Sequence, residues 1–454
     1  MSIESVNPAT GETLQHYAEH DAEAIEQRLQ QANTAFASWR STSMSDRSVL
    51  MRELAQGLQH REHDLARLMT QEMGKPIKAA RGEIEKCAWV CEYYADNAAD
   101  FLNDEVIQTE AANSFVSYQP LGPVLAVMPW NFPFWQVFRF TAPALMAGNV
   151  ALLKHASNVP GCALAIEELF AQAGFPQGCF STLMIGSDAV DALIEDKRVK
   201  AVTLTGSEPA GRAVAAKAGA QIKKTVLELG GSDPYIVLAD ADVRAAAETC
   251  VASRLINSGQ SCIAAKRFIV VNELHDDFVQ HCVALMQDKK CGDPLDEKTD
   301  IGPMAREDLR DALHQQVQDS IAAGAECLLG GQVPDKAGAW YPATVLSNVK
   351  PGMPAYDEEL FGPVAAIIKA QDTDDAIRIA NDSDFGLGAA IFTADTETGE
   401  RIAAEHIEAG AVAINDFVKS DPRMPFGGIK NSGYGRELSA FGIREFVNIK
   451  SVVR

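Results

Sequence analysis

The fold of this chain is constrained most by five short apolar runs that alternate with segments of helical character. The runs cover residues 124–130, 149–155, 181–186, 199–207 and 223–231. Strands that are apolar along their whole length are typical of parallel sheets covered on both faces, and their alternation with helices predicts a doubly wound α/β fold. A second α/β region begins near residue 232, where the candidate strands are PYIVL, RFIVV, VAAIIKA and LGAAIFT.

The segments on either side of this sheet have different patterns. Residues 21–39, 46–73 and 77–100 have the periodicity of helices. SFVSYQP, at residues 114–120, alternates like an exposed strand, and the C-terminal EFVNIKSVVR indicates another strand. A terminal strand needs a sheet edge as its partner, and a second subunit could supply that edge. A chain of 454 residues is also too long for one compact core, so we expect two or three domains.

The overall charge and the cysteine pattern exclude several classes of protein. A formal net charge of −22 argues against binding to nucleic acid or to anionic membranes. The first residues carry no signal-peptide pattern, and no apolar run is long enough to span a bilayer. The nine cysteines form no CxxC pair and no zinc-type cluster with histidine. We therefore expect a reduced, cytoplasmic protein without a metal centre.

Polar residues stand where the predicted parallel strands end, which is where ligands bind in a doubly wound sheet. Asn131, Lys154 and Glu228 occupy such positions, and Gly206 and Ser207 begin a GSxxxG turn before an alanine-rich helix. Backbone N–H groups and the helix dipole favour a phosphate at such a turn. Partial burial would raise the pKa of Glu228 toward the range of a general base. Taken singly, each motif also fits an ordinary turn, cap or solvated side chain.

Cys262, in the stretch INSGQSCIAAKR, has the surroundings of a reactive thiol. The residues before it are small or polar, whereas a structural cysteine is normally packed among larger apolar side chains. No second cysteine or histidine is near enough for a metal site, and the histidines show no pattern typical of a Cys–His hydrolase. A nucleophile needs thiolate character and access, and this loop permits both. Chemistry alone leaves a nucleophile and a structural thiol open.

The order of the motifs along the chain is far more specific than any one of them. PWNFP, GSxxxG, ELGG, GQSC, EELFGP and PFGGIKNSGYGRE follow one another in this chain. In this order they resemble the NAD(P)-dependent aldehyde dehydrogenase superfamily, and the resemblance extends from NPATGE to the last strand. It implies a cofactor-binding domain (residues 1–101 and 121–230), an α/β catalytic domain (231–431) and a small β oligomerisation element (102–120 and 432–454).

The resemblance also implies the catalytic roles. Cys262 would be the nucleophile that carries a thiohemiacetal and then a thioester. Asn131 would form an oxyanion hole with the backbone N–H of Cys262, and Glu228 would activate the water that releases the acid.

Eight residues match contacts to the cofactor in this superfamily: Trp130, Lys154, Ser157, Gly206, Ser207, Leu229, Glu359 and Phe361. One of them departs from the common pattern. NAD-selective members often have a glutamate three residues after the lysine, where this chain has Ser157. Because a carboxylate there would repel a 2′-phosphate, its absence predicts that NAD and NADP are both accepted.

Three residues match positions of the substrate tunnel: Gln136, Arg139 and Ser420. Arg139 and Ser420 replace aromatic residues found in members that oxidise apolar aldehydes, and together they resemble succinate-semialdehyde dehydrogenases. An arginine there would hold a distal carboxylate by a charge-assisted bond, although it could instead form an ion pair within the subunit. A second arginine of some such enzymes is Ile256 here, so glutarate semialdehyde or other short aldehydes could also react.

Three other functions compete with this interpretation. A CoA-acylating aldehyde dehydrogenase would transfer the acyl group to CoA instead of water, which a poised Glu228 disfavours. A non-catalytic structural relative would not need the complete set of Asn131, Glu228, Cys262 and Glu359. A thiol hydrolase would not need the cofactor positions. The resemblance finally implies a homodimer or homotetramer.

Overall fold

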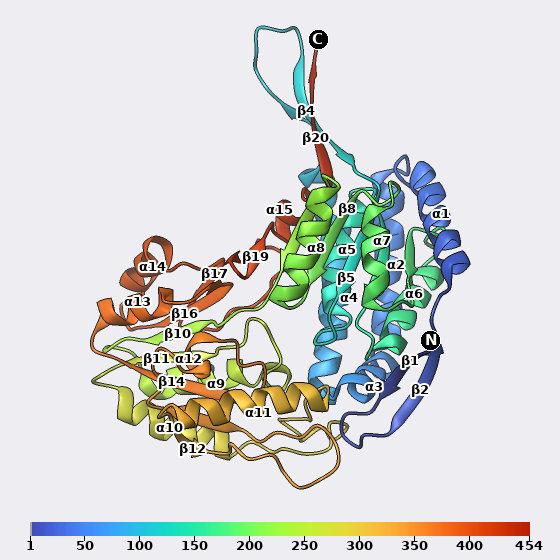
Figure 1. Cartoon of the computed structure of the whole chain (residues 1–454). Helices are drawn as coiled ribbons and strands as arrows, with labels where there is room; N and C mark the ends of the chain where they lie inside the picture. The colour runs from blue at the N-terminus through green and yellow to red at the C-terminus, as the bar shows by residue number, and fades with distance from the viewer. Residues whose placement is uncertain (1) are drawn as a thin grey trace.

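The computed structural model describes residues 2–454 and contains two α/β units and a projecting arm of strands (Figure 1). The first sheet has the order β19-β9-β8-β5-β6-β7, and only β19 runs antiparallel to its neighbour. Its strands are β5 (Pro123–Met128), β6 (Val150–His155), β7 (Phe180–Thr182), β8 (Ala201–Thr205), β9 (Lys224–Glu228) and β19 (Gly433–Tyr434). The five apolar runs are therefore the five parallel strands, and the predicted doubly wound sheet is confirmed.

The helices of this unit match the predicted segments with one correction. They are α1 (Ala22–Trp39), α2 (Met44–His60), α3 (Glu62–Met73), α4 (Ile77–Phe101), α5 (Trp135–Met146), α6 (Pro160–Gln172), the 3-10 turn η1 (Ser187–Ala189), α7 (Val190–Glu195) and α8 (Glu208–Ala220). The prediction of a single helix over 46–73 is wrong, because the chain leaves helical geometry at Arg61 (φ −104°, ψ 11°). The break allows α2 and α3 to pack separately against α4.

An N-terminal hairpin was not predicted. Strands β1 (Ser2–Val6) and β2 (Thr13–Ala18) pair antiparallel in front of α1. Ile3 and Ser5 are the buried residues of β1, whereas β2 is almost entirely exposed. The hairpin therefore carries too little apolar alternation to be recognised as two strands.

The second sheet has the order β12-β13-β14-β11-β10-β16-β17, and it is parallel except for β12. Its strands are β10 (Pro234–Val237), β11 (Arg267–Val271), β12 (Glu326–Leu329), β13 (Thr344–Ser347), β14 (Val364–Ala370), β16 (Gly388–Phe392) and β17 (Ala411–Ile414). The four predicted strands are its four consecutive central members. The strands that were missed lie toward the two edges. β12 is largely exposed, and β13 (TVLS) and β17 (AVAI) are only 4 residues long, too short to stand out as apolar runs.

Helices cover both faces of the second sheet. They are α9 (Val243–Arg254), the 3-10 turn η2 (Ile256–Gly259), α10 (His275–Gln287), α11 (Glu307–Ala322), α12 (Pro354–Asp357), α13 (Thr373–Asn381) and α14 (Thr396–Glu405). Alternate residues of β11 enter different cores, since Ile269 and Val271 pack in one cluster while Phe268 and Val270 pack in the other. The sheet is thus buried from both sides, as its apolar strands predict. Across residues 2–454, no helix has both the length and the apolar character of a membrane span.

The arm is a three-stranded sheet that projects from the two α/β units, with β4 and β20 side by side (Figure 1). Its strands are β3 (Glu105–Val106), β4 (Ser114–Pro120) and β20 (Val447–Val453), in the order β20-β4-β3. The terminal strand therefore finds its partner edge in the same chain.

The connection between the units runs through short elements near the C-terminus. These are the two-stranded pair β15 (Phe385–Gly386) and β18 (Ile429–Lys430), and the helix α15 (Ser439–Ile443). β19 pairs with β9 in the first sheet, and α15 packs on α4 and α5. The division into three domains stays a prediction, and this packing leads us to propose that residues 433–446 belong with the first unit.

Candidate active site

The predicted site residues gather at the point in the first sheet where the order of the strands reverses. β5 and β8 are neighbours although β6 and β7 lie between them in the sequence, and ligands bind at such a switch point. Trp130 and Asn131 follow β5, and Gly206 and Ser207 follow β8. All four line a cavity of about 260 Å³. The other predicted residues that line this cavity are Gln136, Leu229, Cys262, Glu359 and Phe361.

A second cavity, of about 230 Å³, meets the first at the thiol. Among the predicted residues it is lined by Gln136, Arg139, Cys262 and Ser420. Cys262 and Gln136 line both cavities, so the sulfur is reachable from two sides. A nucleophile in this position can meet one small molecule from each cavity, which a buried structural thiol cannot do.

The turn before Cys262 is held in a strained backbone conformation. Asn257 (φ 53°) and Ser258 (φ 54°) are consecutive left-handed residues, which is costly for residues other than glycine. Their side chains hold the turn in place. The Asn257 amide donates to the carbonyl oxygen of Asn131 at 2.7 Å, and the Ser258 hydroxyl accepts from the N–H of Gly302 at 2.9 Å. The loop that carries Cys262 is thereby tied to the end of β5.

Lys266 fixes the peptide groups next to the thiol. Its buried ammonium donates to the carbonyl oxygens of Ser261 (2.9 Å) and Cys262 (2.7 Å) and forms an ion pair with Glu359 at 3.2 Å. In a planar trans peptide the N–H points opposite to the carbonyl. Holding the Ser261 carbonyl therefore directs the Cys262 N–H away from Lys266. Glu359, which also accepts from the N–H of Gly231 at 3.1 Å, connects this lysine to the first cavity.

The electrostatics keep the thiol protonated near neutral pH. Burial raises the pKa of Cys262 to about 12, although Arg139 and Lys266 act in the opposite direction. Attack by the sulfur therefore requires that its proton be removed in the assembled site.

Glu228 is the last residue of β9 and lies deep in the protein, 2% exposed. Burial, followed by repulsion from Glu437, raises the pKa of Glu228 well above its usual range. Neither of its carboxylate oxygens has a hydrogen-bond partner, and it lines neither cavity. Burial thus raises the proton affinity of Glu228 above that of an exposed glutamate, and the side chain lies outside both cavities.

Arg139, on α5, has an intramolecular carboxylate partner. Its buried guanidinium forms an ion pair with Glu437, lies 3.4 Å from the Thr205 hydroxyl, and stands 4.7 Å from the centre of the Phe426 ring. Phe426 and Glu437 exchange backbone hydrogen bonds of 2.8 and 2.7 Å. The C-terminal motif PFGGIKNSGYGRE therefore folds back on itself and presents one aromatic ring and one carboxylate to Arg139. The ion pair within the subunit is present, and Arg139 lines the second cavity as well.

Two predicted cofactor contacts lie outside both cavities. Lys154, near the end of β6, has a pKa lowered by burial. Ser157 is exposed and lines a larger cavity of about 710 Å³ together with Asn158 and Gly186. This cavity also contacts the N-terminal hairpin. The structure does not bring Lys154 and Ser157 into the same cavity as Cys262.

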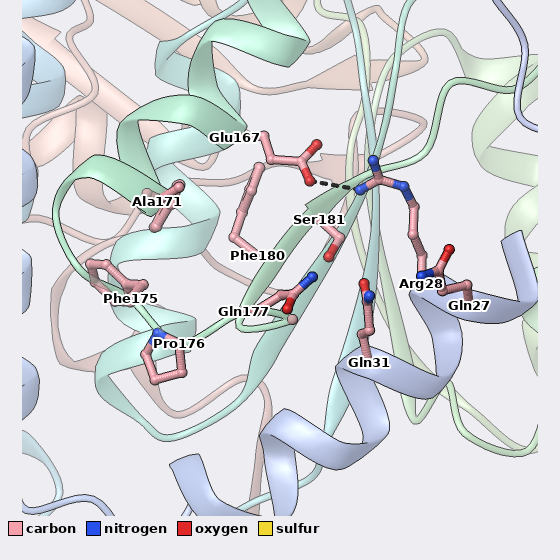
Figure 2. Close-up of a pocket in the computed structure, with 12 residues that line it drawn as sticks. Gln27, Arg28, Gln31, Glu167, Ala171, Phe175, Pro176, Gln177, Phe180 and Ser181 are labelled. Carbon is pink, nitrogen blue, oxygen red and sulfur yellow. Dashed lines mark hydrogen bonds and ion pairs between the residues drawn. The ribbon is translucent and has the colours of Figure 1, made fainter. Parts of the chain in front are cut away.

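A further cavity, of about 550 Å³, lies between α1 and α6 at the β7 edge of the first sheet (Figure 2). Arg28 and Glu167 point toward each other across it and form an ion pair of 2.6 Å. The remaining lining side chains are uncharged, and none is a predicted site residue. The cavity therefore offers no free charge or nucleophile.

The comparison with known proteins identifies the family. A model of the aldehyde dehydrogenase family matches residues 1–452. This chain belongs to the aldehyde dehydrogenase family. A probable NADP⁺-dependent succinate-semialdehyde dehydrogenase of Synechocystis is 53% identical over 452 residues, covering 100% of this chain and 99% of that protein. An NAD(P)⁺-dependent succinate semialdehyde dehydrogenase of Escherichia coli is 50% identical and covers 99% and 97% of the two chains.

A solved structure agrees with this assignment. The succinic semialdehyde dehydrogenase from Streptococcus pyogenes, in complex with NADP⁺, has a TM-score of 0.97 and 38% identity. The alignment covers 100% of this aldehyde dehydrogenase and 99% of that chain.

Six charged residues in or beside the two cavities of this aldehyde dehydrogenase were not predicted from the sequence: Lys75, Glu83, Lys86, Lys266, Lys419 and Glu437. Lys266 is four residues after Cys262, and a basic residue so close to a candidate nucleophile was a usable signal. Glu437 lies at the end of a recognised motif, but nothing in that motif pointed to Arg139 as its partner. Lys86 lies on α4, far from every motif.

Proposed function

We propose that this aldehyde dehydrogenase oxidises succinate semialdehyde to succinate in the cytoplasm, with NADP⁺ or NAD⁺ as the oxidant. The observation that carries the proposal is the charge of the cavity that ends at Cys262. Its lining contains one carboxylate, that of Glu83, and four cationic side chains: Lys75, Lys86, Arg139 and Lys419. The relatives are named succinate-semialdehyde dehydrogenases, and the carboxylate of succinate semialdehyde is complementary to a positively charged cavity. The nine free cysteines suit a reducing compartment.

We propose the following roles for the residues of the site. The Cys262 sulfur attacks the aldehyde carbon, and the carbonyl oxygen becomes the oxyanion of a thiohemiacetal. The amide of Asn131 and the N–H of Cys262 stabilise that oxyanion. A nicotinamide cofactor held in the first cavity would supply a hydride acceptor, and loss of a hydride from the thiohemiacetal carbon would leave a thioester on Cys262. Glu228 then takes a proton from water, whose oxygen attacks the thioester carbon and breaks the C–S bond.

The first cavity suits a nicotinamide cofactor. Ser207 makes no capping hydrogen bond with its side chain, so the first N–H groups of α8 remain free for a phosphate. A Cβ at Gly211 would lie 2.6 Å from the Leu229 side chain, so this glycine lets α8 approach the cavity wall. Glu359 supplies a carboxylate for ribose hydroxyls. Trp130 and Phe361 contact each other edge to face, with ring centres 5.8 Å apart, and both line the cavity.

Ser157 leads us to propose that NADP is used at least as well as NAD. The residue is exposed, lines the cavity next to Gly186, and brings no negative charge to it. A 2′-phosphate would meet no carboxylate at that position.

The arm leads us to propose a homodimer or homotetramer. β20 pairs with β4 on one side only, and its outer edge has no strand partner among the described residues. Ile449 and Val453 on this strand are 63% and 66% exposed. An exposed, partly apolar edge strand is suited to pairing with another subunit.

Initial rates with four combinations of aldehyde and cofactor test the proposal. Succinate semialdehyde and butanal are each assayed with NADP⁺ and with NAD⁺, and glutarate semialdehyde is included as the longer homologue. We expect a kcat/KM for succinate semialdehyde at least about tenfold above that for butanal, since a charge-assisted bond is worth more than about 1.4 kcal/mol. Equal values for both aldehydes would overturn the substrate assignment.

A further inference from the structure

Lys86 differs from the other cations near the substrate cavity, because it has no carboxylate partner. Lys75 forms a buried ion pair with Glu83, and Arg139 forms one with Glu437. At the rim, Lys419 pairs with Asp416 at 2.6 Å. No carboxylate among the described residues lies within ion-pair distance of the Lys86 ammonium.

The contacts of Lys86 direct its ammonium into the cavity. Its Nζ donates to the hydroxyl of Ser420 at 2.7 Å and lies 4.2 Å from the centre of the Trp135 ring. Lys86, Trp135 and Ser420 all line the cavity that contains Cys262. The nearest acidic side chain along the chain from Ser420 is Asp421, and it is bound by Arg423 at 2.6 Å.

A cation that is largely removed from water and has no counter-ion is unfavourable, and the pKa of Lys86 is lowered for this reason. Burial, followed by repulsion from Arg139, lowers the pKa of Lys86 to about 8. The ion pairs of Lys75 and Arg139 are internally neutral, so Lys86 leaves one uncompensated positive charge at the cavity wall. One carboxylate on the substrate would neutralise this charge and take up the free ammonium hydrogens.

We propose that Lys86, together with Ser420, binds the distal carboxylate of the substrate beside Arg139, which lines the same cavity and is also the partner of Glu437. This inference rests on the proposed oxidation of succinate semialdehyde and assigns its recognition to a residue on α4. It accounts for the absence of a second arginine at Ile256, which lines the same cavity. The ammonium of Lys86 supplies the positive charge that a second arginine would have provided.

Lys86→Met tests the proposal, because it removes the charge and keeps the length of the side chain. We expect kcat/KM for succinate semialdehyde to fall at least about 30-fold, the order of effect found when one partner of a buried charge pair is removed. For butanal, which has the same chain length without the carboxylate, we expect a change below about threefold. Lys86→Arg should recover most of the activity with succinate semialdehyde. Lys78→Met, at an exposed position of the same helix, is the matched control.

The outcomes separate this inference from the proposed function. If the unmodified enzyme does not prefer succinate semialdehyde to butanal, the proposed function fails and the inference fails with it. If the unmodified enzyme does prefer the semialdehyde, the inference about Lys86 is tested by itself. It is overturned if Lys86→Met lowers kcat/KM equally for both aldehydes, or lowers it for neither. Competitive inhibition by succinate supplies a second readout, and its inhibition constant should rise in Lys86→Met but not in Lys78→Met. Should Lys86→Met fail to fold, the same comparison is made with Lys86→Gln.

Discussion

At the scale of the residue, the electrostatics of the site depend on which charged side chains have an ion-pair or hydrogen-bond partner. Lys266 is fully engaged, with two carbonyl oxygens and Glu359, and Arg139 is engaged by Glu437. Cys262 and Glu228 have no partner that stabilises their charged forms enough to offset burial, and both are shifted toward the protonated state. Burial thus raises the pKa of both groups and makes the charged form of each less favourable than it would be in water.

The thiol of Cys262 should react faster with increasing pH throughout the neutral and mildly alkaline range. Its pKa is about 12, so below pH 11 the thiolate fraction rises about tenfold for each pH unit. The rate of alkylation by iodoacetamide in the free enzyme, measured between pH 7 and pH 10, should follow that slope. An alkylation rate that reaches a plateau below pH 8 would contradict the raised pKa of Cys262. The Cys262→Ser variant shows which part of the measured alkylation belongs to this residue.

Lys266→Met should lower kcat with both succinate semialdehyde and butanal. The variant removes the donor that holds the Ser261 carbonyl, so the Cys262 N–H is less well directed. We expect a loss on the order of 10²-fold, similar to that for removing one oxyanion donor. It also removes the partner of Glu359, so the Kd for NADP⁺, measured by fluorescence titration, should rise. An unchanged kcat with an unchanged Kd would show that Lys266 serves packing alone.

At the scale of the element, the N-terminus of α5 is fixed by a residue of α4. The Glu83 carboxylate accepts the backbone N–H groups of Phe134 and Trp135, each at 2.9 Å, and also binds Lys75. Free N–H groups at a helix start need such an acceptor. Because α5 carries Gln136 and Arg139, this contact sets where both side chains enter the cavities.

Glu83→Ala should destabilise the protein by about 3–5 kcal/mol, because it leaves the buried Lys75 ammonium without a counter-ion. The measurement is the free energy of unfolding from urea denaturation, monitored by tryptophan fluorescence. The double variant Lys75→Met, Glu83→Ala should be less destabilised than Glu83→Ala, since both variants lose the acceptor at the helix start but only the single variant buries a charge alone. Equal destabilisation of the two variants would assign the loss to the helix start and not to the ion pair.

At the scale of the whole molecule, the two α/β units meet at the thiol. The first unit contributes β5, β8 and α5 to the cavities, and the second contributes the Cys262 loop and Glu359. The C-terminal segment connects them, because Phe426 and Glu437 contact Arg139 before the chain continues into the arm. The active site and the arm are thus close along the chain but separate in space.

Ile449→Asp should weaken the assembly that we propose for the arm. Ile449 is 63% exposed on β20, and a buried aspartate at a subunit interface would lack a partner. Light scattering after gel filtration should show a shift toward smaller species. A species of unchanged mass, or an unmodified protein that is already monomeric, would contradict the proposed role of the arm.

The sequence by itself determined the central strands of both sheets and the helical character of the segments at 21–39, 46–73 and 77–100. Those features depend on local periodicity and on residues that directly follow a strand, as Asn131 and Ser207 do. Edge strands such as β12 escaped prediction, because an exposed strand lacks the apolar run that marks a buried one.

Only the tertiary structure decided which charges pair. Lys86 and Ser420 are hydrogen-bonded although they are 334 residues apart, and Arg139 meets Glu437 across a similar distance along the chain. An ion pair depends on the separation of two side chains in space, and no spacing within the sequence encodes that separation. The sequence predicted Arg139 as a residue that binds the substrate's carboxylate, and this stays a prediction. Lys86, which the packing of α4 against α5 brings to the same cavity without a carboxylate partner, could be found only in the tertiary structure.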